Sequence, residues 1–314
     1  MRLGFLLAVL LTVACAAGRE ERGADGSAGV GGEGASINTG GSGGAVLNGS
    51  GGGPPGEDCP PEAEKVYVVD SVNTLYSFDP PTLSFTTIGP LSCTAPPISA
   101  VPFSMAVDRD AGAWMVALDG RLFRIDTSNA QCTQTSYAPN QQGFMVFGMG
   151  FSSDGPGSRS EQLFVHDNSP FYGLPDVTWS GLATIDVATN SLAPIGLYTQ
   201  LGSSRAELTG TGDGRLFGFF PDEVPPVVAE IDKTNVTILS VAPQASVESM
   251  NGGFAFAHWG GDFWLFYSTP TNPSGSVVAQ YQPALGTTPV VKNDVPFVVV
   301  GAGVSTCAPL QPPN

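Results

Sequence analysis

The side chains best suited to chemistry in this 314-residue chain are few, and they do not form a familiar catalytic motif. Glu207 and Glu248 are candidates for a general acid and base, because glycoside cleavage needs two carboxyl groups roughly 5–10 Å apart across a pocket. His166 and His258 are the two histidines, too few for a zinc site or a nucleophile triad. We expect His166 to be solvated or to cap a turn, and His258 to make a structural hydrogen bond.

Several acidic and glycine-rich motifs are better explained as turns than as ligand sites. Calcium requires six to eight oxygens that converge on one point, whereas the turn aspartates are spread along the chain. Asp followed closely by Gly is a common turn signal, so we expect no metal and no cofactor. The aspartates considered are Asp108, Asp110, Asp154, Asp213 and Asp262.

The N-terminus has the layout of an export signal. Arg2 precedes an apolar run over residues 6–13, and the small residues 14–17 follow, which predicts a signal peptide over residues 1–16. Residues 11–15 resemble a bacterial lipobox, which would make Cys15 the lipidated first residue, although Thr12 departs from the aliphatic pattern. The alternative is plain cleavage after Ala16.

Residues 17–58 are predicted to be a disordered Gly-rich linker. Sixteen of the 41 residues from 18 to 58 are glycine, so the segment cannot bury enough apolar surface to offset its ordering entropy. A linker after a lipidated cysteine would hold a domain clear of a membrane. We expect an outer-membrane or cell-surface lipoprotein that touches the membrane only through this anchor, or else a periplasmic or secreted protein.

Charge and cysteine count narrow the class of the remaining domain, residues 59–314. The chain has 12 Lys and Arg against 28 Asp and Glu, a formal net charge of −16, which disfavours nucleic acid as a partner. Four cysteines remain after the export signal. In an exported protein an even number without C-x-x-C spacing predicts two disulfides rather than a metal site.

The domain contains a recurring unit typical of an all-β fold. A short strand that ends in Asp begins at Leu75, Leu122, Leu182 and Val228, and a degenerate copy begins at Val278. The spacings of 47, 60, 46 and 50 residues match a four-stranded propeller blade. Small residues dominate the expected inner strands and suit the crowded axis of a ring. These features predict a five-bladed β-propeller.

The two ends of the domain are expected to complete one blade together. The first unit lacks an inner strand, and a spare strand over residues 298–304 follows the last unit, so the C-terminal strand would close the ring. Cys59 and Cys307 then fall on the same side of this blade, which predicts a disulfide between them. Elimination leaves Cys93 with Cys132, although simple topology places these two at opposite ends of their strands.

The sequence resembles a group of bacterial exported propeller lipoproteins of unassigned function. The motifs are P-F-S-M-A-V-D (102–108), A-E-L-T-G-T-G-D-G-R-L-F (206–217), W-G-G-D-F (259–263) and G-A-G-V-S-T-C-A-P (301–309). The resemblance implies the fold and an exported setting, and it brings no catalytic residues. A more distant resemblance to propellers with six to eight blades leaves a sixth blade as an alternative.

One face of the expected propeller carries the candidate ligand site. An insertion over residues 168–180 brings Phe171, Tyr172 and Trp179 to a place where other units have short turns, and Arg205 and Asn251 should lie nearby. Aromatic side chains with a few polar groups suit a sugar or a peptide. We predict a monomeric, non-enzymatic binding or scaffold protein of the cell envelope with a protein or carbohydrate partner. The alternatives are an extracellular glycoside hydrolase or lyase, and a purely structural component.

Overall fold

The computed structural model describes residues 59–94, 100–172 and 180–313. The predicted signal peptide, Cys15, the linker to residue 58, and Trp179 lie outside the described residues. Among the described residues, no helix has both the length and the apolar character needed to cross a membrane.

The described chain is built almost entirely of strands, with three short 3₁₀ helices: η1 (Pro61–Glu64), η2 (Ser92–Thr94) and η3 (Ser169–Tyr172). The strands are β1 (Val66–Asp70), β2 (Thr74–Asp79), β3 (Ser84–Pro90), β4 (Pro102–Val107), β5 (Gly112–Ala117), β6 (Leu122–Asp126), β7 (Cys132–Gln134), β8 (Phe147–Ser153), β9 (Glu161–Asp167), β10 (Gly181–Asp186), β11 (Ser191–Leu197), β12 (Glu207–Gly210), β13 (Leu216–Phe220), β14 (Val227–Ile231), β15 (Ile238–Pro243), β16 (Phe254–Trp259), β17 (Asp262–Thr269), β18 (Asn272–Tyr281), β19 (Val290–Val295) and β20 (Val299–Gly303).

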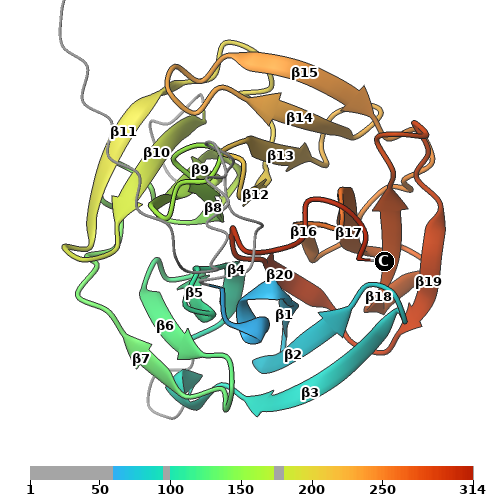
Figure 1. The fold of residues 1–314 in the computed structure, drawn as a ribbon, viewed down its shortest axis with the longest axis horizontal. Coiled ribbons are helices and arrows are strands. Elements are labelled where there is room, and N and C mark those ends of the chain that lie inside the picture. Colours follow the sequence, from blue (N-terminus) through green and yellow to red (C-terminus); the bar gives the residue numbers. More distant parts are fainter. Residues whose placement is uncertain (1–58, 95–99, 173–179, 314) are drawn as a thin grey trace, which may run out of the picture. The chain divides into compact units, whose positions relative to one another are not determined.

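These strands form five four-stranded antiparallel sheets, which are the blades of a propeller (Figure 1). Blade 1 has the order β20-β1-β2-β3, and blades 2 to 5 are β4–β7, β8–β11, β12–β15 and β16–β19. The C-terminal strand β20 pairs with β1, with Tyr67 opposite Gly303. The predicted five-bladed propeller and its closure by the C-terminal strand are therefore confirmed.

The innermost strands pack backbone against backbone around the axis, which explains their small side chains. A Cβ atom on Gly148 of β8 would overlap the carbonyl oxygen of Ala206, which precedes β12. A Cβ atom on Gly301 of β20 would lie 3.0 Å from the backbone nitrogen of Met105 on β4. Larger residues at these positions would force neighbouring blades apart.

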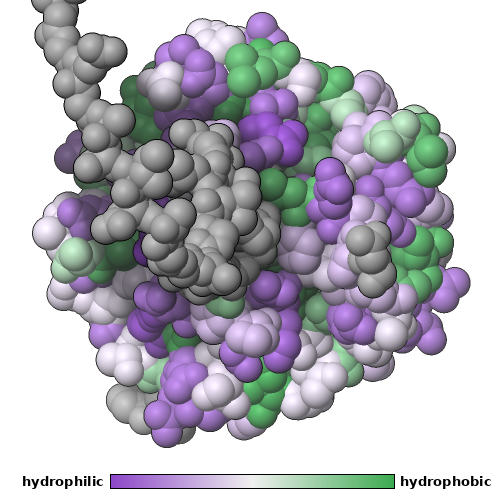
Figure 2. All heavy atoms as spheres, in the orientation of Figure 1, coloured by the Kyte–Doolittle hydropathy of each residue, from purple (hydrophilic) through white to green (hydrophobic). Residues whose placement is uncertain are grey.

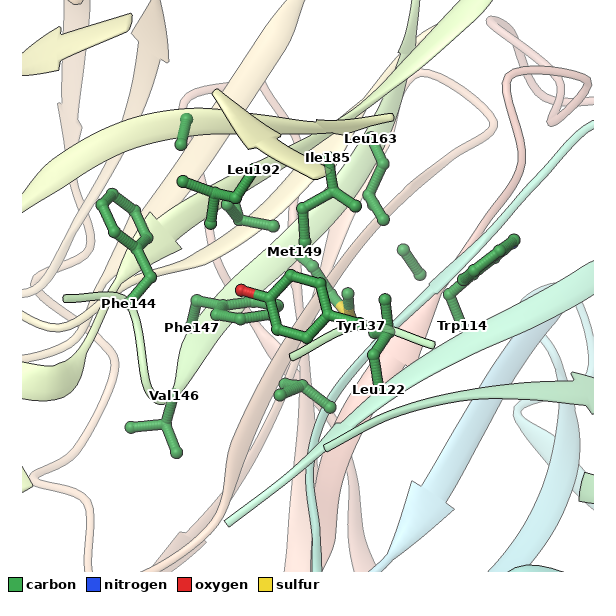
Figure 3. Close-up of a cluster of buried hydrophobic side chains, with 14 of the residues drawn as sticks. Trp114, Leu122, Tyr137, Phe144, Val146, Phe147, Met149, Leu163, Ile185 and Leu192 are labelled. Atoms are coloured by element: carbon green, nitrogen blue, oxygen red, sulfur yellow. The ribbon is translucent and has the colours of Figure 1, made fainter. Parts of the chain in front are cut away.

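Hydrophobic side chains fill the spaces between neighbouring blades. Between blades 2 and 3, Trp114 and Leu122 face Phe147, Met149 and Leu163 in one buried cluster (Figure 3). Burying each large apolar side chain contributes ~1.5–3 kcal/mol to the free energy of unfolding. The core is therefore distributed around the ring, and each blade depends on both of its neighbours.

The recurring aspartates cap the turns that follow their strands. Asp126, Asp186 and Asp232 each accept a hydrogen bond from the backbone N–H two residues further on, at 2.9, 2.8 and 2.8 Å. Asp108 accepts hydrogen bonds from the backbone N–H groups of Asp110 and Gly112 at 3.1 and 2.9 Å. Such Asx turns account for the recurrence of aspartate at these places.

Both predicted disulfides are present, Cys59–Cys307 and Cys93–Cys132. The second pair joins η2, which follows the outer strand β3, to the start of the next outer strand, β7. The backbone N–H of Cys132 donates to the hydroxyl of Ser92 at 2.8 Å beside this bond. Two disulfides are typical of proteins that fold outside the reducing cytosol.

Candidate functional site

The propeller has two faces that differ in what covers them. The face that we call the loop face carries the connections from outer to inner strands and those from second to third strands, including residues 71–73, 118–121 and 168–172. The opposite face, which we call the termini face, carries η1, the C-terminal residues 304–313 and the remaining turns. Figure 1 is viewed from the termini face.

Six of the twelve large hydrophobic side chains that are exposed in the described residues lie on the loop face. They come from connections of blades 1 to 4, and Tyr172 is 47% exposed. Isolated exposed apolar residues are normal on a protein surface, whereas several on one face favour an interaction site. These residues are Val72, Val101, Leu118, Phe171, Tyr172 and Val224.

Four side chains form a connected row across blades 2 to 5, which we call the aromatic arc: Phe103, Tyr172, Arg205 and Phe254. The rings of Phe103 and Tyr172 meet edge to face at 5.4 Å. The Arg205 guanidinium lies near the Tyr172 hydroxyl and 5.3 Å from the ring centre of Phe254. The arc therefore links a blade 3 loop to blades 2, 4 and 5.

Arg205 is held in place by Asp222. The guanidinium donates to both carboxylate oxygens of Asp222, from Nε at 2.9 Å and from Nη2 at 2.7 Å. This hydrogen bonding raises the pKa of Arg205 above its ordinary value. The pair fixes a planar cation on the loop face without leaving it free to bind a separate anion.

The loop-face residues predicted from the sequence meet only in part. Phe171 and Tyr172 are exposed and Arg205 joins Tyr172, as expected for neighbours. Asn251 is also exposed in the connection before β16, where its backbone groups bond to Ser268. Trp179 lies outside the described residues.

The two candidate catalytic carboxylates are in unlike environments. Glu207 is 2% exposed, and it accepts a hydrogen bond from the Ser104 hydroxyl at 2.6 Å, while that hydroxyl accepts one from the backbone N–H of Met149 at 3.2 Å. Burial raises the pKa of Glu207 well above its ordinary value. Glu248 is exposed in the connection between β15 and β16.

Glu207 therefore serves the ring rather than a substrate pocket. Ser104 lies on the inner strand of blade 2 and Met149 on that of blade 3, while Glu207 belongs to blade 4. The hydrogen bonds among these three residues therefore connect three blades. A substrate would have to displace these contacts to reach it. The arrangement does not favour the predicted acid–base pair.

The expectations for both histidines need correction. His166 is not solvated: it is fully buried on β9, with Nε2 3.1 Å from the carbonyl oxygen of Ser204 and Tyr198 beside its ring. Desolvation lowers the pKa of His166 to about 4. The imidazole of His258 makes no hydrogen bond to any residue in the described part of the chain, in contrast to the predicted structural bond.

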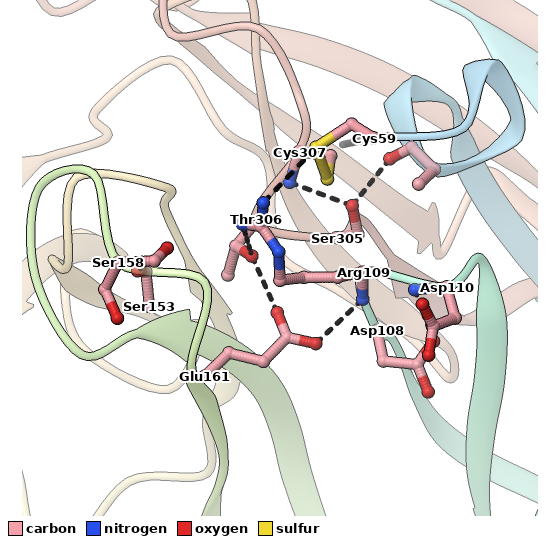
Figure 4. The surroundings of a disulfide bond; sticks show 11 residues. Cys59, Asp108, Arg109, Asp110, Ser153, Ser158, Glu161, Ser305, Thr306 and Cys307 are labelled. Atoms are coloured by element: carbon pink, nitrogen blue, oxygen red, sulfur yellow. Dashed lines mark hydrogen bonds between the residues drawn. A yellow bond between two sulfur atoms is a disulfide. The ribbon is translucent and has the colours of Figure 1, made fainter. Parts of the chain in front are cut away.

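On the termini face, hydrogen bonds join the C-terminal end of the chain to neighbouring blades (Figure 4). Glu161 accepts hydrogen bonds from the backbone N–H of Arg109 at 2.7 Å and from the hydroxyl of Thr306 at 2.6 Å. Arg109 in turn donates to Thr306 at 3.0 Å and to the sulfur of Cys59 at 3.5 Å. This network joins blades 2 and 3 to the disulfide that closes blade 1.

Burial changes the proton affinity of Glu161 in this network. Desolvation raises the pKa of Glu161 to about 7, and the hydrogen bonds from Thr306 and Arg109 only partly oppose this shift.

Outside its grey atoms, the termini face is a mixture of hydrophilic residues and scattered hydrophobic ones (Figure 2).

Sequence reasoning missed the aliphatic part of the loop face and the role of Glu161. Val101 and Leu118 are single apolar residues in connections, and the backbone N–H of Leu118 donates to the carbonyl of Val101 at 2.9 Å. A search for exposed apolar residues at the ends of predicted strands could have found them. Glu161 carried no signal, because its partners are distant in sequence.

No family model matches this chain, and no curated protein matches it either. Solved structures with partial similarity include TolB from Acinetobacter baumannii, at 15% identity over 73% of this chain and 52% of TolB, with a TM-score of 0.41. A virginiamycin B lyase from Staphylococcus aureus is 12% identical over 68% of this chain and 61% of the lyase, with a TM-score of 0.39.

A protein of unknown function from Bacteroides thetaiotaomicron is 13% identical over 75% of this chain and 56% of that chain, with a TM-score of 0.43. The chain spans 52%, 61% and 56% of the lengths of these three proteins. The similarities carry no argument about function.

Proposed function

We propose that this chain is a non-enzymatic binding or scaffold protein of the cell envelope that holds a protein partner on its loop face. The observation that carries the proposal is the set of exposed hydrophobic side chains that connections from four blades bring to that face. Tyrosine and arginine at the centre of an interface supply much of its binding free energy, and Tyr172 and Arg205 provide both on this face.

A protein partner fits the loop face better than a glycan does. The exposed side chains there are aliphatic as well as aromatic, with Val101 and Leu118 in blade 2 beside Phe103 and Tyr172 of the aromatic arc. Apolar side chains spread over several blades suit the broad surface of another protein, whereas sugar sites are usually small and concave.

The arrangement of the ends supports an outward-facing loop face. The described chain begins at Cys59, which the disulfide fixes on the termini face. A lipid anchor and linker before Cys59 would therefore enter the propeller on the termini face. Under this proposal the loop face is turned away from the membrane, and the propeller is a monomer.

The test compares capture of envelope proteins by three forms of the full chain. The double variant Leu118→Ser with Tyr172→Ser should lose a protein that the wild type retains, with at least about a tenfold loss of affinity once that protein is purified. The control is Val187→Ser with Leu285→Ser, which removes exposed apolar residues from turns on the other face. Equal capture by all three forms would contradict the proposal.

A further inference from the structure

A cavity of about 260 Å³ lies on the termini face between blades 4 and 5, away from the loop face. Blade 4 contributes Arg215, Phe217 and Glu230 to its walls. Blade 5 contributes His258, Phe263 and Tyr281. The proposed partner-binding surface uses none of these six residues.

The cavity coincides with a departure from the repeat. In each of blades 2 to 5, the three inner strands contribute one residue each to a row of directly paired cross-strand neighbours. This row packs toward the preceding blade. In blades 2 to 4 these rows hold only apolar residues or glycine, but blade 5 places an imidazole and a phenol there. The rows are Val107–Ala113–Ile125, Phe151–Leu163–Ile185, Gly210–Leu216–Ile231 and His258–Phe263–Tyr281.

The gap between blades 4 and 5 lacks the long polar side chain that covers the gap between blades 3 and 4. In blade 4, Lys233 lies 5.7 Å from the ring centre of Phe164 and donates hydrogen bonds to the Ser152 hydroxyl and the Ser153 carbonyl of blade 3. The corresponding residue of blade 5 is Pro283, two positions after Tyr281 as Lys233 is two after Ile231. Proline has no long polar side chain, so it cannot close the gap in the same way.

His258 is a buried polar group that still lacks a partner. It is 3% exposed, it lines the cavity, and its ring lies edge-on to Phe263 at 5.2 Å. No residue in the described ranges forms a hydrogen bond with the imidazole, which leaves its nitrogens open to a cavity ligand or to water. Burial lowers the pKa of His258 to about 4, so at neutral pH one ring nitrogen donates and the other accepts.

The other walls combine the half-buried ring of Tyr281, which is backed by buried aromatic rings, with a carboxylate. The rings of Phe263 and Tyr281 lie within 18° of parallel with centres 5.8 Å apart, and Phe217 meets Phe263 edge to face at 4.8 Å. Glu230 is partly buried, and within the described ranges no group donates a hydrogen bond to it. Arg215 already pairs with Asp213 at 2.9 Å, which disfavours an anionic ligand.

We propose that this cavity binds one neutral sugar ring. A pyranose has a C–H face that packs on aromatic side chains and a rim of hydroxyl groups that both donate and accept. Glu230 would accept from this rim, and His258 would do both. The volume falls just below the usual range for ligand pockets, which fits a single ring rather than an oligosaccharide.

The test measures binding of glucose, galactose, mannose and N-acetylglucosamine to the full chain by saturation-transfer NMR, followed by calorimetry. At least one of these sugars should bind. Tyr281→Ile, which restores the isoleucine of the other rows, and Glu230→Gln should each weaken that binding by about tenfold or more. Tyr172→Ile makes the same change on the loop face and should leave sugar affinity unchanged.

Thermal unfolding of each variant checks that the variant is folded. Glu230→Gln alters a partly exposed side chain, so this variant still tests the cavity if Tyr281→Ile does not fold. The proposal is overturned if none of the four sugars binds at tens of millimolar. It is also overturned if both cavity variants bind like the wild type, or if benzylamine binds at Glu230 while the sugars do not. Loss of the loop-face partner in Tyr172→Ile leaves this result unaffected, so the two sites are tested separately.

Discussion

The two faces of this propeller use their side chains for different purposes. On the termini face, a disulfide, Glu161 and Thr306 join the chain ends to blades 2 and 3, and the groups of this network are mutually bonded. On the loop face, connections from four blades leave hydrophobic side chains in solvent. The contrast places ring closure and the proposed partner-binding surface on opposite faces, so that substitutions on the loop face can be tested without opening the ring.

Removing β20 should have the largest effect on stability. Deletion of residues 299–313 takes away the inner strand of blade 1, exposes the edge of β1, and removes Cys307. We expect a chain without a cooperative thermal transition by circular dichroism. A stable, cooperative propeller without these residues would show that the termini face does not hold the ring closed.

The two disulfides should differ in what they contribute. The chain-entropy model assigns about 5 kcal/mol to a closed loop as long as that of Cys59–Cys307 and about 4 kcal/mol to one as long as that of Cys93–Cys132. Their sequence separations are 248 and 39 residues. Alanine pairs at each disulfide, compared by urea unfolding, should therefore rank in this order. The reverse order would mean that Cys93–Cys132 contributes more to the free energy of unfolding than Cys59–Cys307 does.

Glu161 should make stability depend on pH. Its folded pKa of about 7 lies above its ordinary value of 4.5, so the folded state holds the proton more tightly. Its stabilising contribution is complete below about pH 4.5 and is lost as the pH rises through 7, on the order of 2 kcal/mol for this partly exposed group.

Glu161→Gln cannot titrate, so the variant should lose this part of the fall in melting temperature between pH 5 and pH 8. Burial also raises the pKa of Glu207 and lowers the pKa values of both histidines, so these groups add their own pH dependence of stability. The quantity to compare is therefore the difference in melting temperature between variant and wild type at each pH. Identical slopes for the two proteins would contradict the assigned pKa of Glu161.

Substitutions on the loop face should have the smallest effect on stability. Leu118 and Tyr172 are exposed, so Leu118→Ser with Tyr172→Ser should change the free energy of unfolding by about 0.5 kcal/mol or less per site. Urea unfolding measures this directly. A loss of several kcal/mol would mean that these side chains cover the blades' own core and are not available to a partner.

Much of the architecture was predictable because it repeats. Five strands at blade-length spacing, four of them ending in Asp, and a missing first inner strand were enough to predict the ring and the pairing of β20 with β1. Three of the four recurring aspartates accept a backbone N–H within the turn that follows, so the signal survives in a single sequence.

Side-chain environments were less predictable because they depend on contacts between blades. Glu207 looked like an accessible acid at the start of a strand, yet its partners lie on inner strands of two other blades. His166 looked like a turn residue, yet Tyr198 and Phe220 bury it. The Cys93–Cys132 disulfide likewise joins η2, after blade 1, to β7 of blade 2.

Site-specific photo-crosslinking in the native envelope tests the central proposal most directly. A photoreactive phenylalanine at position 101 or 118 on the loop face should yield a covalent adduct with one partner protein. The same group at position 187 or 285, in turns on the termini face, should yield none. Adducts from the termini-face positions alone, or from none of the four, would contradict binding at the loop face.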